Sequence, residues 1–146
     1  MEPAAASVYS WKGRFFVHPM FVRGAYGKAS MPVACLGADA TDMQFGQALQ
    51  DALHASARIR RKPADGESAK ILKQLGARSW DVLMREAHTV QVARRSAGIG
   101  MTPMHYWIDV KERERGLRGE EEFLVKATAT SADLGRELRR LLQRPE

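Results

Sequence analysis

Two segments far apart in the chain share one pattern of capping residues and apolar positions. Thr41 and Thr130 each stand where a helix would begin, and the residue three places on, Gln44 or Asp133, can complete a capping box. Apolar residues then recur at i, i+4, i+7 and i+8, which gives a helix one apolar face. They are Phe45, Leu49, Ala52 and Leu53 in the first segment and Leu134, Leu138, Leu141 and Leu142 in the second. The pattern predicts two similar strand–helix units, with the first helix over about residues 42–58.

A glycine follows the first apolar residue of each predicted helix, at Gly46 and Gly135. Inside a helix, glycine costs roughly 1 kcal/mol relative to alanine. A glycine kept at that cost indicates that another part of the protein approaches closely. We expect a sheet to lie against both positions.

Alternating apolar and polar residues predict strands over much of the remaining chain. We expect strands within residues 8–17, 32–36, 89–102, 106–110 and 123–127, with turns at Gly13 and at residues 96–98. Pro103 should end its strand or lie on an edge of the sheet, and residues 106, 108 and 110 should be half-buried. Residues 23–30 and 112–119 are expected to be loops, and Ser68 and Ser79 to start two short helices. The predicted fold class is α+β, a mainly antiparallel β-sheet packed by three to four helices.

The length of 146 residues fits a single domain, 1–146, in which we expect residues 1–7 to be a flexible tail. The composition is 45% hydrophobic and 27% charged, as in ordinary globular proteins. No apolar run approaches the roughly 18 residues that cross a bilayer, and the N-terminus lacks a secretory signal. Cys35 is the only cysteine, so no internal disulfide can form. These features predict a cytoplasmic protein with no membrane contact.

The chain lacks the residue patterns of the common catalytic and metal sites. Gly98-Ile99-Gly100 is not followed by the lysine and helix of a phosphate-binding loop. The four histidines are scattered, and Cys35 lies in an apolar run where a buried, inert thiol is expected. We predict no catalytic residue, no metal, no cofactor and no enzymatic activity. A ribonuclease built from His18 or His105 with a lysine or arginine stays open as an alternative.

The formal net charge of +6 is distributed in patches of both signs. Basic residues gather after the first predicted helix and on the last one: Arg58, Arg60, Arg61, Lys62, Arg136, Arg139, Arg140 and Arg144. Basic patches bind nucleic acid or acidic protein surfaces. A small basic RNA-binding module is therefore an alternative function, with Trp11, Trp80 and Trp107 as candidate base-stacking platforms. We expect at least two of these tryptophans to pack in the core instead.

Several segments resemble one bacterial protein family. They are residues 45–53 with Ser56, then 76–80, 90–92, 99–103 and 134–138. In these segments the chain resembles the immunity proteins of contact-dependent growth inhibition (CDI) systems, over roughly residues 32–143. The resemblance implies a non-catalytic cytoplasmic protein whose partner is the C-terminal toxin domain of a cognate CdiA adhesin. Such toxins are frequently nucleases, many of them cleaving tRNA, and no direct nucleic-acid binding is expected of the immunity protein.

A nuclease presents a basic substrate cleft, so an inhibitor that blocks it should offer carboxylates. One segment gathers the acidic residues that we predict to contact the toxin: Asp109, Glu112, Glu114, Glu120, Glu121 and Glu122. A solvated hairpin without a partner is the alternative interpretation. A rival interface uses the arginine clusters, including Arg60 and Arg61, against an acidic toxin surface. The oligomeric state stays open.

Overall fold

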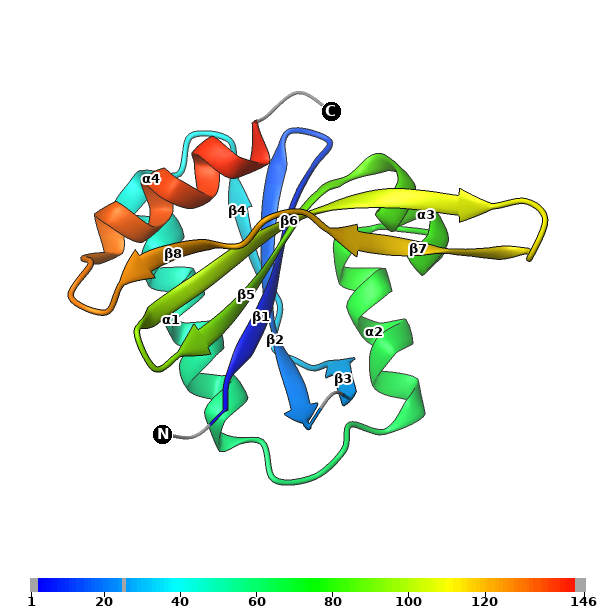
Figure 1. Cartoon of the computed structure of the whole chain (residues 1–146), viewed down its shortest axis with the longest axis horizontal. Coiled ribbons are helices and arrows are strands. Elements are labelled where there is room, and N and C mark those ends of the chain that lie inside the picture. The colour runs from blue at the N-terminus through cyan, green and yellow to red at the C-terminus, as the bar shows by residue number, and fades with distance from the viewer. Residues whose placement is uncertain (1–2, 25, 144–146) are drawn as a thin grey trace.

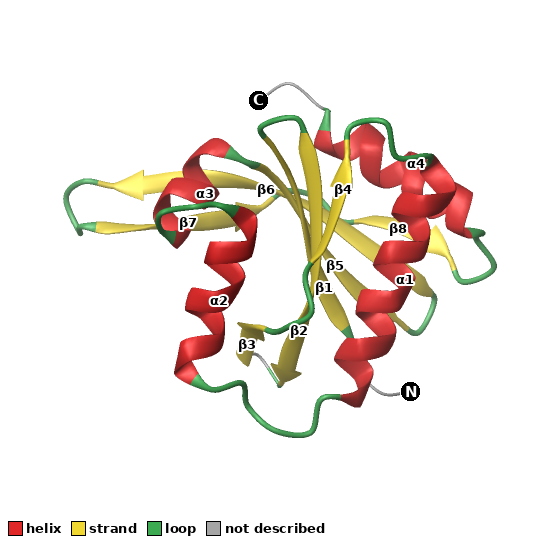
Figure 2. Ribbon diagram, turned by 180° about the vertical axis from the view of Figure 1, so that it is seen from behind, coloured by secondary structure: helices red, strands yellow, loops and turns green. Residues whose placement is uncertain are grey.

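In the computed structural model, which describes residues 3–24 and 26–143, eight strands form one antiparallel sheet and four helices pack against it (Figures 1 and 2). The strands are β1 (Ala5–Trp11), β2 (Arg14–Arg23), β3 (Tyr26–Ala29), β4 (Ala34–Gly37), β5 (His88–Arg95), β6 (Gly98–Asp109), β7 (Glu114–Gly119) and β8 (Phe123–Lys126). The helices are α1 (Asp42–Arg58), α2 (Asp65–Leu75), α3 (Trp80–Glu86) and α4 (Ser131–Leu142). The α+β fold class is confirmed.

The predicted pair of strand–helix units is part of a larger internal repeat. The sheet order is β3-β2-β1-β5-β6-β7, with β4 added to β2 and β8 added to β6. Each half contains a hairpin, β1–β2 in the first and β5–β6 in the second. The second strand of each hairpin pairs along its first part with the strand that precedes a long helix, and along its last part with another strand. β2 pairs with β4 and β3 as β6 pairs with β8 and β7, so that Val17 opposite Ala34 corresponds to Met101 opposite Phe123. The helices α2 and α3 lie between the two halves in sequence.

A proline marks the same position in both halves. Pro19 and Pro103 lie where the second strand changes partner, and their carbonyl oxygens accept hydrogen bonds from the backbone nitrogens of Ser30 and Glu120 at 3.0 and 2.8 Å. Pro103 does not end its strand, because β6 continues to Asp109. Nor does it lie on an outer edge of the sheet, because β6 pairs with β5 on one side and with β8 and β7 on the other. A strand residue directs its N–H and C=O to the same side, so the N–H that Pro103 lacks would face the break between β8 and β7.

The predicted caps of α1 and α4 are confirmed. Thr41 and Gln44 form one capping box, and Thr130 and Asp133 form the other. The two helices cross in contact with one another, side by side on one face of the sheet (Figure 1). The expectation that a sheet lies against the two helix glycines is wrong. A Cβ on Gly46 would overlap the backbone of Ser131, and a Cβ on Gly135 would overlap that of Asp42, so each glycine admits the first turn of the other helix.

Two hydrophobic clusters lie on opposite faces of the sheet. The larger one packs α1 and α4 against the central strands and includes Phe45, Leu49, Leu134 and Leu138. The smaller one packs α2 and α3 against β1 and β2, and it contains Tyr9, Trp11, Phe16, Ile71, Leu75, Leu83 and Ala87. Successive residues of the central strands therefore pack into one cluster or the other in alternation. Because both faces are buried, these strands are apolar along nearly their whole length.

The flexible tail expected over residues 1–7 is wrong for its described part, because β1 begins at Ala5 and lies in the middle of the sheet. Ala4 and Ala6 are buried, and the backbone nitrogen of Ala5 donates to the Ser56 hydroxyl at 2.9 Å. That hydroxyl donates in turn to the carbonyl oxygen of Met20 at 2.5 Å. Residues 1 and 2 lie outside the described part of the chain.

Three further local expectations need correction. Residues 23–30 contain the short strand β3, and most of residues 112–119 form β7, since each segment pairs with the strand before it. Cys35 is exposed, because the residues of β4 that face the core are its neighbours Ala34 and Leu36. Ile108 and Val110 are 59% and 80% exposed, because this end of β6 extends beyond the helices.

His18 lies buried beneath α3 and makes the stability of the fold depend on pH. Its Nδ1 donates to the carbonyl oxygen of Pro19 at 2.9 Å, so its Nε2 accepts the hydrogen bond from the Tyr9 hydroxyl at 3.0 Å. Burial lowers the pKa of His18 below its ordinary value of 6.5. The unfolded chain therefore binds a proton near pH 6.5 that the folded chain does not.

We expect the free energy of unfolding to fall as the pH drops below about 6.5, by at most about 1.4 kcal/mol per pH unit until the lowered pKa is reached. Urea unfolding at pH 7.5, 6.0 and 5.0 measures this loss. A His18→Gln variant should lose most of the pH dependence, whereas replacing the exposed His54 by Gln should leave it intact. An equal pH dependence in the His18→Gln variant would contradict the assignment.

Candidate functional site

The hairpin of β6 and β7 projects from the body of the protein beyond the covering helices, and we call residues 104–119 the arm (Figures 1 and 2). Its tip carries three of the predicted toxin-contacting residues, Asp109, Glu112 and Glu114. Asp109 and Glu114 are opposite one another in the ladder. The Asp109 carboxylate also accepts hydrogen bonds from the backbone nitrogens of Lys111 and Glu112 at 3.0 and 3.1 Å, so this residue shapes the turn.

The other three predicted residues, Glu120, Glu121 and Glu122, lie at the opposite end of β7, in the connection to β8. The six residue steps from Glu114 to Glu120 separate the two groups by roughly 20 Å. Glu122 forms an ion pair with Arg95 at 2.8 Å and covers Gly100 of β6. The structure therefore divides the acidic segment into a group at the tip of the arm and a group at its base.

Asp81 on α3 holds the arm in place. The hydroxyl of Tyr106 donates to Asp81 Oδ1 at 2.8 Å, and Arg115 approaches the same oxygen at 3.4 Å. These contacts come from both strands of the arm, and the hydrogen bond to the Asp81 carboxylate raises the pKa of Tyr106. Exposed apolar side chains at Ile108 and Val110 continue beyond this anchor. The arm thus offers an apolar surface next to a tip in which the carboxylates alternate with Lys111, Arg113 and Arg115.

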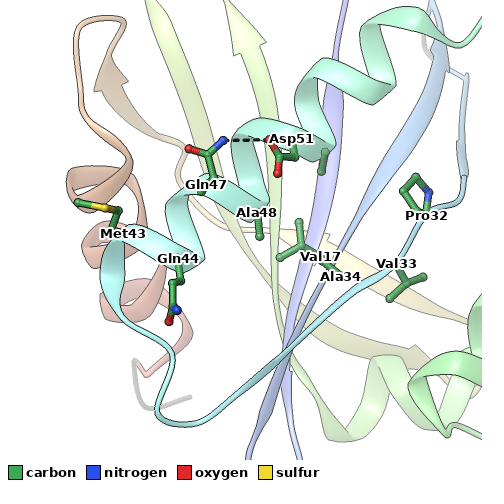
Figure 3. Close-up of a pocket in the computed structure, with 10 residues that line it drawn as sticks. Val17, Pro32, Val33, Ala34, Met43, Gln44, Gln47, Ala48 and Asp51 are labelled. Carbon is green, nitrogen blue, oxygen red and sulfur yellow. Dashed lines mark hydrogen bonds between the residues drawn. The ribbon is translucent and has the colours of Figure 1, made fainter.

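A second candidate site is a groove between β4 and α1, of about 640 Å³ (Figure 3). Val17 and Ala34 form its floor, Ala48 and Ala52 its wall on α1, and Pro32 and Val33 the opposite rim. Its polar groups are on α1, where the side-chain amide of Gln47 donates to Asp51 Oδ1 at 2.9 Å. The sequence does not reveal this groove, because its small lining residues are an ordinary core pattern in each segment taken alone.

The basic groups of α4 are largely engaged within the protein. Arg139 pairs with Asp42 at 2.9 Å, Arg136 with Asp133 at 2.8 Å, and Arg140 with Glu137. After α1, Arg60 donates to the carbonyl oxygen of Ala57, and Lys62 lies over the ring of Tyr26. The cluster at residues 58–62 is the more exposed of the two basic groups.

The three tryptophans lie in two kinds of surroundings, two against the smaller hydrophobic cluster and one on the arm. Trp11 is 6% exposed, and Trp80 packs edge-on against His18 with ring centroids 6.4 Å apart. Trp107, on the arm, is covered on one side by the guanidinium of Arg118, 4.1 Å from the ring centroid. Two of the three therefore belong to the packed interior, as predicted. Within residues 3–24 and 26–143, no group of three histidine, cysteine or acidic side chains is arranged to hold a metal ion.

The model of one protein family, described as CDI immunity protein (CdiI), matches residues 5–145. The chain belongs to the CDI immunity protein family. The resemblance found in the scattered motifs is therefore confirmed, and for this immunity protein the match extends through β1 to β3, ahead of the residue range in which those motifs occur. No curated protein matched the chain in a sequence search.

Two solved structures share the fold of this immunity protein. One is a protein of unknown function from Neisseria meningitidis, with a TM-score of 0.69 at 15% identity, covering 99% of this chain and 96% of that one. The other is from a CdiA-CT/CdiI toxin and immunity complex from Yersinia pseudotuberculosis, with a TM-score of 0.67 at 16% identity, covering 100% and 99%. At these identities the likeness is one of fold. Among the described helices, none has the length and hydropathy needed to cross a bilayer.

Proposed function

We propose that this immunity protein acts in the cytoplasm as a non-catalytic inhibitor of the C-terminal toxin domain of a cognate CdiA adhesin. The toxin is a nuclease, with tRNA as the first substrate to test, and the immunity protein blocks its active site or its substrate-binding surface. The observation that carries this proposal is the family match over residues 5–145. The full-length likeness in fold to a chain of a toxin and immunity complex supports it.

The arm supports a blocking mechanism in which carboxylates enter a basic cleft. Its tip places Asp109 opposite Glu114, and no ion pair joins either carboxylate to a cation among the described residues. Like charges that face each other on a strand pair repel, and a cation from a partner relieves that repulsion. Complementary charge also raises the association rate and discriminates between partners. A rigid surface burying about 1,600 Å² in total suffices for tight binding.

The test uses the purified immunity protein with the toxin domain encoded next to it. We expect a stable complex, loss of toxin activity at stoichiometric amounts of immunity protein, and rescue of growth in cells that express the toxin. A toxin domain that neither binds the protein nor loses activity would contradict the proposal. Turnover of a substrate by the immunity protein alone would contradict its non-catalytic role.

Charge reversal can show which of the two acidic groups, at the tip or at the base of the arm, contacts the toxin domain. Glu112→Lys with Glu114→Lys should slow association with the toxin domain by about tenfold or more at low salt, because steering depends on charge. Glu120→Lys with Glu121→Lys makes the same change at the base, and Arg60→Glu with Arg61→Glu tests the rival basic surface. Glu122 is left unchanged because it pairs with Arg95. Unchanged association rates in both glutamate pairs would remove the acidic interface.

The RNA-binding alternative makes a different prediction. Affinity for RNA should then fall steeply with salt and should depend on the exposed cluster at residues 58–62. The internal pairing of the α4 arginines weighs against this alternative, because those cations are already partly neutralised. Tight, salt-sensitive RNA binding without any toxin binding would favour it.

A further inference from the structure

The two halves of the internal repeat differ at the groove between β4 and α1. In the second half the equivalent place lies between β8 and α4. Val17 corresponds there to Met101, and Ala34 to Phe123, because these residues form equivalent pairs in the sheet. Ala52 corresponds to Leu141, because both stand at the same distance from the capping threonine of their helix. Three lining positions of the groove therefore carry smaller side chains than their counterparts.

In the second half, the protein fills this place with its own side chains. The ring of Phe123 packs against the main core, and the guanidinium of Arg140 lies over that ring, 5.2 Å from its centroid. An aromatic ring with a cation above it is a favourable pair. The first half has neither group, because Ala34 stands in place of Phe123 and Asp51 in place of Arg140.

One charged position at the groove is reversed relative to the second half, because Asp51 corresponds to Arg140, which is itself paired with Glu137. Asp51 is exposed at the rim, and its one hydrogen bond shown by the structure comes from the neutral amide of Gln47. Met43, also at the rim, is 64% exposed. An open apolar groove with an acidic rim is complementary to a bulky apolar side chain that has a basic group next to it. This is the same pair of groups that the second half supplies from within.

We propose that the groove between β4 and α1 receives a bulky apolar side chain, aromatic in kind, and a neighbouring lysine or arginine of the toxin domain. The apolar side chain lies against Val17, Ala34 and Ala52, and the cation pairs with Asp51. This inference rests on the proposed function, since it names where that toxin domain makes contact. It adds to the carboxylates at the tip of the arm a second contact, formed by a separate part of the fold.

The experiment fills the groove by placing the side chains of Phe123 and Arg140 at the corresponding positions of the first half. The variant Ala34→Phe with Asp51→Arg should fold, because Phe123 and Arg140 fit the equivalent place, and its thermal unfolding midpoint should stay at or above that of the wild type. Its Kd for the purified toxin domain, measured by titration calorimetry, should rise at least 100-fold. The control Asp65→Arg makes the same charge change on α2, on the opposite face of the sheet. It removes only an exposed ion pair with Lys28 and should change Kd less than threefold.

A folded double variant that binds the toxin domain within threefold of the wild type would overturn the inference. If the double variant does not fold, Asp51→Arg alone decides, because this side chain is exposed. Its Kd should rise at least tenfold, and a value equal to that of Asp65→Arg would overturn the inference. Failure of the wild-type protein to bind the toxin domain is a distinct result, which contradicts the proposed function itself.

Discussion

Replacing Gly46 with alanine should destabilise the protein by more than about 3 kcal/mol, a large share of the 5–15 kcal/mol that stabilises a typical domain. The added Cβ would overlap the carbonyl oxygen of Ser131, which belongs to the backbone of α4 and cannot rotate away. Relief requires α1 and α4 to separate, and both helices are packed into the larger core. Urea unfolding followed by circular dichroism measures the loss.

Gly66 in the first turn of α2 provides the matched control. A Cβ built there meets no atom within 4 Å, so Gly66→Ala should leave stability unchanged or raise it by up to about 1 kcal/mol. Gly135→Ala should behave like Gly46→Ala, because its Cβ would overlap the carbonyl oxygen of Asp42. If Gly46→Ala and Gly135→Ala each lowered the free energy of unfolding by less than about 1 kcal/mol, α1 and α4 would not be in such close contact.

Truncating Phe45 to alanine should cost about 3–5 kcal/mol. The side chain is fully buried at the centre of the larger core, and its ring centroid lies 4.6 Å from that of Phe15. Alanine leaves a cavity between α1 and β2 that the surrounding backbone can close only in part. The free energy of unfolding from urea titration, at the same pH as the wild type, measures the effect.

Phe45→Leu is the informative comparison, because Leu134 occupies the equivalent position of α4. Leucine keeps most of the buried apolar surface, so we expect a loss of about 1 kcal/mol. A loss as large as that of Phe45→Ala would mean that the aromatic contact with Phe15, and not the filled volume, stabilises this position.

Helix ends that carry a side-chain cap or a terminal glycine could be predicted, because these depend on neighbouring residues. The expected start of a helix at Ser68 is wrong, because α2 begins at Asp65 without a side-chain cap. Thr41 with Gln44, and Thr130 with Asp133, form their capping boxes within a single turn, and Gly76 ends α2 in the left-handed conformation. The alternation that predicts a strand is equally local. It led to an error at β3, because the sequence Tyr26–Ala29 carries two exposed residues and little apolar pattern, and its strand conformation comes from pairing with the preceding strand β2.

The acidic segment illustrates the same limit for the site. Its residues are close in sequence, but β7 places Glu114 and Glu120 at opposite ends of one strand. The interior positions of Trp11 and Trp80 were predictable from their apolar surroundings. The groove was not, because it results from small residues contributed by three separate segments, β2, the approach to β4, and α1.

The sequence by itself determined the fold class, the boundaries of α1, the N-terminal caps of α1 and α4, and the similarity of the two strand–helix units to each other and to an immunity protein family. These features depend on residue types at short, regular spacings. The tertiary structure alone decided that Gly46 and Gly135 each contact the backbone of the other long helix, and where the arm projects. It also decided that the groove between β4 and α1 is open, whereas the equivalent place between β8 and α4 is filled. Those features depend on pairs of residues far apart in the chain, which only the packing of the two halves brings together.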